Sequence, residues 1–262
     1  LVLLVGFIVG IAQQASGINS VYFYAPTIFE QSGVGTNAAF MQATYIGIIN
    51  VVFTIIAMLT VDRFGRKPLL LLGLLGVFVS MSITAYGFHS ASYEMPPERA
   101  AEIAERLGTP ELAVIGGMRF DNDLEFKGAI VDIIGRSALR ANESTLIEAA
   151  IRMNPRIVLV GILGFVASFA FSLGPVMWVL FSEIFPNRIR GVAMAVMGVV
   201  NSGVSTGVQF IFPWELANLG TARTFLIYGA VSLICLLLIA KLLPETRGRT
   251  LEELEQELVR RH

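Results

Sequence analysis

The sequence predicts an all-α membrane protein with six transmembrane helices and a mostly helical soluble insert between the third and the fourth. Composition is the first reason, because 55% of the 262 residues are apolar and only 15% are charged, whereas about a quarter of residues are charged in soluble proteins. The distribution of charge is the second, because six stretches contain no Asp, Glu, Lys or Arg. These stretches are 1–29, 31–61, 69–93, 157–182, 191–214 and 224–240.

Each charge-free stretch is long enough, or nearly so, to cross a bilayer core, which requires about 20 apolar residues. One charged side chain at mid-membrane costs about 2.5–3.5 kcal/mol on insertion scales. Six such stretches therefore indicate an integral, multi-pass membrane protein surrounded by lipid. The predicted divisions are three spans in 1–93, the insert in 94–156, three more spans in 157–243 and a cytoplasmic tail in 244–262.

Lys and Arg in the short loops predict the orientation, because cytoplasmic loops carry an excess of both. Basic residues follow the second span (Arg63, Arg66, Lys67), the fourth (Arg188, Arg190) and the sixth (Lys241, Arg247, Arg249). The short loops on the opposite side contain only Arg223. We therefore expect the C-terminus in the cytoplasm and the insert on the outer face.

The insert, residues 94–156, holds 11 acidic and 8 basic side chains, about half of all the charge in the chain. Pro96 and Pro97 followed by acidic residues predict a helix start, and Gly108 predicts its end. A second start is expected at Thr109, and apolar patterns predict two more short helices within 124–139 and 146–153. We expect an accessory cap or a partner surface, without direct contact to a ligand.

The charges and reactive side chains argue against several functions. A net charge of −1 argues against a nucleic-acid partner, and Cys235 is the only cysteine, so no intrachain disulfide can form. Asp121, Asp123 and Glu125 imitate the start of a calcium loop, but Phe126 stands where that loop requires Gly. The sequence shows no nucleophile–base pair and no metal-ligand spacing, so we expect neither an enzyme nor a metal or cofactor.

Three amides in the first span, Gln13, Gln14 and Asn19, predict a binding site. On a straight helix Asn19 would lie about 120° from Gln13 and 140° from Gln14, so the three could not converge on one ligand. Ser16 and Gly17 between them are a natural place for the helix to break. Irregular backbone at membrane depth is tolerated only where it lines a cavity or is buried in protein, which favours a discontinuous helix of the kind found in transporters.

The fourth span carries Gly174 and Pro175, followed by Trp178. Proline removes a helical hydrogen bond, and a tryptophan far from both interfaces does not belong to an aromatic belt. An indole face covers C–H groups while amides bind hydroxyls, so this set suits a neutral, hydroxylated ligand. Asn50 and Asn201 are lone amides, and their spacing alone favours helix packing.

Four motifs resemble those of the sugar porter family of the major facilitator superfamily. The seventh-helix signature of the family is matched by residues 13–19 (QQASGIN) and 24–26 (YAP), and its loop between helices eight and nine is matched by residues 62–67 (DRFGRK). Its tenth helix and the following loop are matched by residues 174–178 (GPVMW) and 182–191 (SEIFPNRIRG). Its C-terminal motif is matched by residues 244–248 (PETRG). The order and spacing are those of the family, and the resemblance covers everything except the insert. The chain is most similar to bacterial proton-coupled xylose and hexose transporters.

The resemblance implies that the six spans are the C-terminal half of a major facilitator fold, equivalent to helices 7–12 of twelve. A small neutral sugar, a pentose or a hexose, would then bind between this half and the missing N-terminal half and cross by alternating access. The implied location is the bacterial inner membrane. The protonatable aspartate of proton-coupled members lies on the first helix, outside this chain, so symport and uniport both stay open.

The resemblance also implies roles for individual residues. Sugar-binding positions are Gln13, Gln14, Asn19, Asn50, Trp178 and Asn201; gating or hinge positions are Gly17, Phe23, Tyr24, Gly174 and Pro175; and a cytoplasmic charge network comprises Asp62, Arg63, Arg66, Glu183, Arg190 and Glu245. The family usually has two tyrosines where this chain has Phe23 and Tyr24, so one hydroxyl of the outer gate is missing. The alternatives are a porter of inositol, another polyol or a cyclic acid, and a transporter-like sugar sensor that does not transport.

Overall fold

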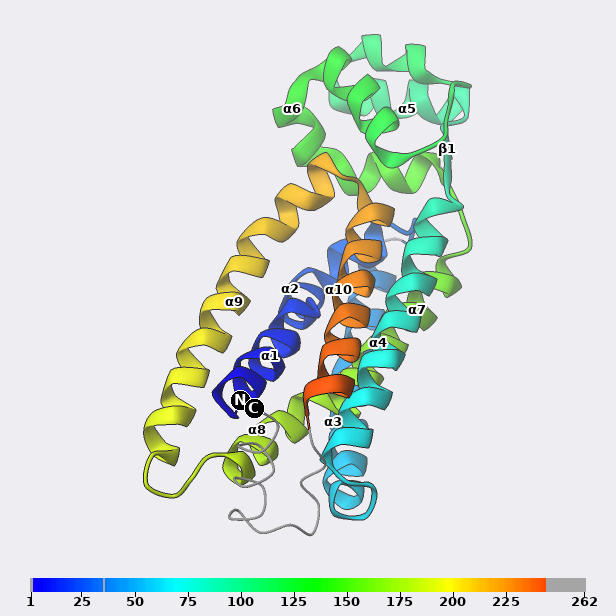
Figure 1. Ribbon diagram of the computed structural model, residues 1–262. Coiled ribbons are helices and arrows are strands. Elements are labelled where there is room, and N and C mark those ends of the chain that lie inside the picture. The colour runs from blue at the N-terminus through cyan, green and yellow to red at the C-terminus, as the bar shows by residue number, and fades with distance from the viewer. Residues whose placement is uncertain (1, 35, 244–262) are drawn as a thin grey trace.

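The computed structural model describes residues 2–34 and 36–243 and shows a bundle of long helices with a smaller lobe at one end (Figure 1). Within those residues, six helical segments are long and apolar enough to cross a membrane. They are Leu3–Glu30, Asn37–Phe64, Arg66–His89, Pro155–Ile184, Arg190–Asn218 and Thr221–Leu242, which confirms the six predicted spans. The predicted tail, with Glu245, lies outside the described residues.

The first and fourth spans are each interrupted. The first consists of α1 (Val2–Ala15) and α2 (Ile18–Glu30), separated at Gly17, whose φ of 85° is left-handed. The fourth consists of α7 (Pro155–Phe171) and α8 (Leu173–Ile184), separated at Ser172. Pro175 follows this second break and has no N–H to donate to the carbonyl four residues earlier, which weakens the helix there. The first interruption falls at the predicted Ser16–Gly17 step, whereas the second falls at Ser172, two residues before the hinge expected at Gly174 and Pro175.

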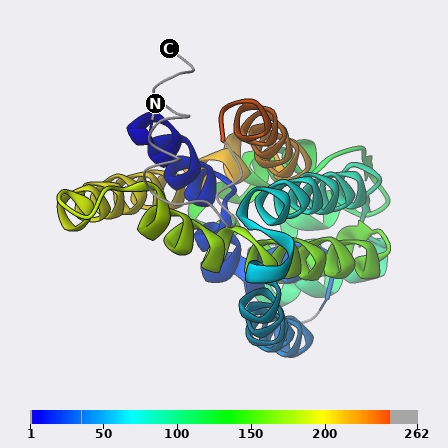
Figure 2. The same ribbon diagram turned by 60° about the horizontal axis from the view of Figure 1, so that its bottom comes forward.

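The remaining spans are single helices: α3 (Thr36–Phe64), α4 (Arg66–His89), α9 (Arg190–Asn218) and α10 (Thr221–Leu242). α4 packs against both α7 and α10, and buried phenylalanines such as Phe165 and Phe225 fill the core around them. α9 packs mainly on α1, and both views place it at one edge of the bundle (Figures 1 and 2). Its exposed apolar side chains include Val192, Val199 and Phe210.

The insert forms the lobe at the end of the bundle, which we call the insert end. It contains α5 (Pro97–Leu107), the 3₁₀ helix η1 (Pro110–Ile115), α6 (Asp123–Ala150), and the strands β1 (Ser92–Glu94), β2 (Arg119–Phe120) and β3 (Ile151–Arg152). The strands form a small antiparallel sheet in the order β2-β1-β3. The expected mostly helical lobe is therefore present, with a sheet that the sequence analysis did not predict.

The helices of the insert follow the predicted order but not all of the predicted limits. α5 ends at Gly108, as expected, with a left-handed φ of 66°. α6 is continuous from Asp123 to Ala150 except at Gly135, whose φ is 80°, so the break precedes the expected one. A separate apolar core includes Tyr93 and Phe126. Burial, and then the charge of Asp123, raises the pKa of the Tyr93 phenol, which therefore stays protonated.

Candidate functional site: an amide cluster between two helix breaks

The break at Gly17 brings together two amides that a straight helix would separate. Asn19 Nδ2 donates to Gln14 Oε1 at 2.9 Å, across the interruption. The Ser16 hydroxyl donates to the Gln13 carbonyl at 2.6 Å and so provides a partner for a backbone group that the break exposes. The break thus allows Asn19 and Gln14 to point toward each other, although on a straight helix they would point in different directions.

α9 completes the cluster with Asn201, which lies between the two glutamines. Its Nδ2 donates to Gln13 Oε1 at 2.8 Å and to the Gly10 carbonyl at 2.9 Å, and its Oδ1 accepts from Gln14 Nε2 at 3.0 Å. We call Gln13, Gln14, Asn19 and Asn201 the amide cluster. Asn201 is therefore joined to both glutamines by hydrogen bonds, and its role in sugar binding stays a prediction.

Gln13 also links this cluster to the second helix break. Its Nε2 donates to the carbonyl of Leu173 at 3.0 Å and more weakly to that of Gly174 at 3.4 Å. Both carbonyls lie immediately after the interruption at Ser172. The two discontinuous spans therefore meet at one buried side chain, which bonds directly to the backbone beside the second break.

Two further members of the network escaped the sequence analysis. The hydroxyl oxygen of Ser205 accepts from Asn19 Nδ2 at 2.7 Å and from Gln209 Nε2 at 2.9 Å. Asn201, Ser205 and Gln209 follow one another at intervals of four residues, which places them on one face of α9. The sequence analysis treated Asn201 as a lone amide, although the interval of four residues to Ser205 and Gln209 already indicates a polar stripe on this helix.

Burial separates the members that a ligand can reach from those that support them. Gln13 and Asn201 are 5% and 7% exposed, whereas Gln14 and Asn19 are half-buried. Trp178 on α8 is 44% exposed and meets Phe181 edge to face, with ring centroids 6.0 Å apart. Gln14, Asn19 and Trp178 can therefore contact a ligand, while Gln13 and Asn201 hold the cluster in shape.

Three predicted site residues make no side-chain hydrogen bond with the amide cluster in the described part of the chain. Asn50 is on α3 and makes no hydrogen bond to the cluster within the described part of the chain. Phe23 is 70% exposed, and the Tyr24 ring packs against Phe212 at 5.3 Å. Their roles in binding and gating stay predictions.

The break at Gly17 is bordered by an aromatic residue of α10. A Cβ atom at Gly17 would lie 2.9 Å from Cδ1 of Tyr228, so the ring packs directly on the glycine. The Tyr228 hydroxyl donates to Glu215 Oε2 of α9 at 2.8 Å. The spacing of residues in the sequence did not indicate this pair.

Charged residues meet at the other end of the bundle, where α3 ends and α8 ends. The Arg66 guanidinium pairs with Asp62 at 3.0 Å and with Glu183. Of the other predicted members, Arg190 donates to the Phe185 carbonyl at 3.2 Å, and Arg63 forms no ion pair with any residue in the described ranges. The structure therefore assembles Asp62, Arg66 and Glu183, which we call the charge cluster.

Two interrupted helices whose breaks meet at uncharged polar groups are typical of one class of protein, the membrane transporters. Within that class, the chain belongs to the Sugar (and other) transporter family, whose model matches residues 1–98 and 133–258. The match confirms the family that the sequence motifs indicate. It also extends into the insert, so that only residues 99–132 between the matched ranges stand outside it.

Individual relatives agree with this assignment. The chain is 32% identical to the D-xylose-proton symporter of Escherichia coli over 260 residues, covering 97% of this chain and 40% of that protein. It is 30% identical to the glucose facilitated diffusion protein of Zymomonas mobilis over 261 residues, covering 97% of this chain and 42% of that protein. These relatives are named as transport proteins, which agrees with the expectation that the chain is not an enzyme.

A solved structure shows the same fold. The inward open conformation of the xylose transporter XylE from E. coli is 30% identical, with a TM-score of 0.67, and the match covers 98% of this chain and 42% of that chain. The fold is therefore that of the C-terminal half of a major facilitator superfamily protein. The chain spans about 40% of the length of the relatives that it matches.

Proposed function

We propose that this chain is the C-terminal half of a monosaccharide transporter that works by alternating access, with a small neutral sugar bound at the amide cluster. The observation that carries the proposal is the meeting of the two helix breaks at Gln13, beside the half-buried Gln14 and Asn19. The named relatives, which include xylose and glucose transporters, support the same substrate class.

The chemistry of the site suits sugar hydroxyls. Each amide offers two N–H donors and a carbonyl acceptor, and a hydroxyl both donates and accepts. The amides satisfy one another without ligand, for example through the bond from Gln14 to Asn201, so a sugar must exchange these bonds for its own. The exposed Trp178 ring supplies an apolar surface for the C–H groups of a pyranose.

Alternating access requires two states of similar free energy, and the chain offers elements suited to such a change. Left-handed Gly17 separates α1 from α2, and the charge cluster ties α3 to α8 at the end opposite the insert. We place the insert end outside the cell and the charge cluster and tail in the cytoplasm, because the basic loops lie at the latter end. Ion pairs there would hold the pathway closed on the inside.

Uptake is proposed to be coupled to protons, as in the xylose-proton symporter to which the chain is similar, and to take place in a bacterial inner membrane. The glucose relative is named as a facilitated diffusion protein, so uniport is the alternative to be tested. Abolition of uptake by a protonophore would support symport, and unchanged uptake would support a uniporter.

Substrate class is tested by calorimetric titration of the complete transporter, this chain with its N-terminal half, with xylose, glucose, galactose, inositol and a cyclic acid such as quinate. Saturable binding of a pentose or hexose, with no binding of quinate, is expected. Binding of inositol or quinate alone would reject the monosaccharide assignment while keeping a hydroxyl-binding site. Sugar binding without any uptake in liposomes would indicate a sensor instead.

A further inference from the structure

The insert forms hydrogen bonds with the C-terminal end of α2, the half-helix that follows the break at Gly17. The Ser144 hydroxyl of α6 donates to Glu30 Oε2 at 2.6 Å, and Gln31 Nε2 donates to Glu143 Oε1 at 3.5 Å. In the turn after α2, a Cβ atom at Gly33 would lie 2.5 Å from Cγ2 of Ile151. The end of α2 is therefore in close contact with both α6 and β3.

The insert is also attached to the start of α10. Asp123 Oδ2 accepts from the backbone N–H and from the hydroxyl of Thr221, both at 3.0 Å. The first N–H groups of a helix have no partner within it, and a carboxylate there is favoured by the helix dipole. Asp123 and Thr221 are 9% and 2% exposed, so this contact is shielded from water.

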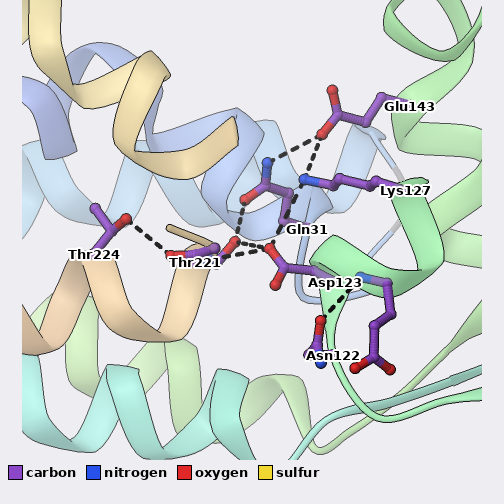
Figure 3. A network of polar contacts seen from close by, with 9 residues as sticks. Gln31, Asn122, Asp123, Lys127, Glu143, Thr221 and Thr224 are labelled. Carbon is purple, nitrogen blue, oxygen red and sulfur yellow. Dashed lines mark hydrogen bonds and ion pairs between the residues drawn. The ribbon is translucent and has the colours of Figure 1, made fainter. Parts of the chain in front are cut away.

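One polar network joins the two attachments (Figure 3). The Thr221 hydroxyl lies 3.2 Å from Gln31 Oε1 as well as 3.0 Å from Asp123, so its single proton is shared between an α2 partner and an insert partner. Lys127 Nζ lies 2.8 Å from Glu143 and 3.9 Å from Asp123. Thr221 is therefore common to both attachments, so loss of its hydroxyl weakens the hold on α2 and on α10 together.

The insert is connected directly to α4 and α7, two of the closely packed helices of the bundle. β1 begins three residues after the end of α4, β3 ends three residues before α7, and the two strands pair with each other. α4, α7 and α10 pack closely. Through the insert, the far end of α2 is thus fixed to these three helices, while its near end follows the left-handed Gly17 and carries Asn19 of the amide cluster.

We propose that Asp123 and Ser144 of the insert are positioning residues for the sugar site. Ser144 holds the end of α2 through Glu30, and Asp123 fixes Thr221, whose hydroxyl also bonds Gln31. Through α2, these contacts hold Asn19 against Gln14 and Ser205. Neither residue belongs to the amide cluster, but α2 can bend at Gly17 only if these contacts open or if the insert moves with it. The transport role of this arrangement rests on the proposed function, whereas the mechanical coupling of the insert to α2 does not.

The experiment measures the position of α2 and sugar uptake separately in the complete transporter. Spin labels at Thr27→Cys on α2 and Tyr86→Cys on α4, both exposed positions, report the separation of these helices after Cys235→Ser. The test variants are Ser144→Ala, which loses the bond to Glu30, and Thr221→Val, which loses the shared hydroxyl. Thr221→Ser keeps that hydroxyl, and Arg99→Gln breaks an exposed ion pair elsewhere in the insert.

The proposal predicts a broader or shifted distance distribution in Ser144→Ala and Thr221→Val, and a change in sugar KM of about fivefold, the effect of losing one hydrogen bond. Thr221→Ser and Arg99→Gln should match the parent protein in both readouts. Parental distances and KM in folded Ser144→Ala and Thr221→Val would overturn the proposal. If the parent takes up no sugar, the proposed function fails, and the distances alone still decide whether the insert positions α2.

Discussion

Asn19 lies beyond the break at Gly17 and still reaches Gln14, so the site depends on one backbone conformation as much as on side-chain chemistry. Gln14 and Asn19 are half-buried, whereas Gln13 and Asn201 are almost completely buried. From this difference we propose that the first pair contacts the ligand directly and that the second pair supports it. Substitutions at these positions should therefore differ in whether they lower sugar affinity or protein stability.

Gln14→Ala and Trp178→Ala should weaken sugar binding far more than Gln42→Ala. Removing Gln14 takes away the proposed ligand contact and the donor to Asn201 Oδ1, at about 1–3 kcal/mol per unpaired group, while Asn19 keeps its bond to Ser205. Gln42 is the matched control, since it is an amide on α3 outside the amide cluster. Titration calorimetry measures the affinities, and parental values in both test variants would contradict the assigned site.

Gly17→Ala should lower the stability of the protein. An L residue with a left-handed backbone costs about 1–2 kcal/mol, and its Cβ would press on Tyr228, 2.9 Å away. Gly47→Ala on α3 is the control, because nothing lies within 4 Å of that position and alanine favours a helix. Thermal unfolding in detergent should show a decrease for the first and no decrease for the second. Equal melting temperatures would mean that the break tolerates a side chain.

At the scale of elements, the charge cluster connects α3, α4 and α8 through Arg66, whose side chain is only 12% exposed. Such a connection can form in one conformation and open in another, and a ligand need only shift an equilibrium of a few kcal/mol between them. The charges are far from the amide cluster along α8, so they can influence conformation without touching the sugar.

Glu183→Gln should open the charge-cluster end of the bundle while sugar affinity stays near the parental value. A cysteine at Ile11, 39% exposed on α1, reports this opening through its labelling rate after Cys235→Ser. Arg188→Gln is the control, a charge change at the same end outside the charge cluster. Labelling should be faster in Glu183→Gln than in Arg188→Gln or the parent protein. Equal labelling rates in the two variants would mean that Glu183 affects only the membrane topology and does not keep this end closed.

The insert shows which elements a sequence predicts well. α5 and its end at Gly108 follow from local signals, namely Pro97 at the start and a glycine that accepts a left-handed φ. The strands β1 to β3 are two or three residues long, too short for an alternating pattern, and they form only because distant segments meet. Long-range contacts of this kind are invisible in a single sequence.

For the whole molecule, the six spans and the break at Gly17 were predictable because charge-free length and amides beside a Ser-Gly step are strong signals. In the fourth span Pro175 indicated a hinge, and the break lies three residues earlier, at Ser172. The partners of each amide were not predictable. Ser205 entered the site although no motif marks it, and Asn50 stayed outside the amide cluster although the resemblance assigns it to sugar binding. Which side chains meet depends on how α9 and α3 pack, and that packing is set by the whole bundle.

The most direct test of the account is counterflow of labelled xylose and glucose in liposomes that contain this chain together with its N-terminal half, or this chain alone. The complete transporter should show saturable, stereospecific counterflow that Gln14→Ala strongly reduces, because the amide cluster binds the sugar. The chain alone should show none, since one wall of the pathway is absent. Saturable counterflow by the chain alone, or parental counterflow in Gln14→Ala, would contradict the account.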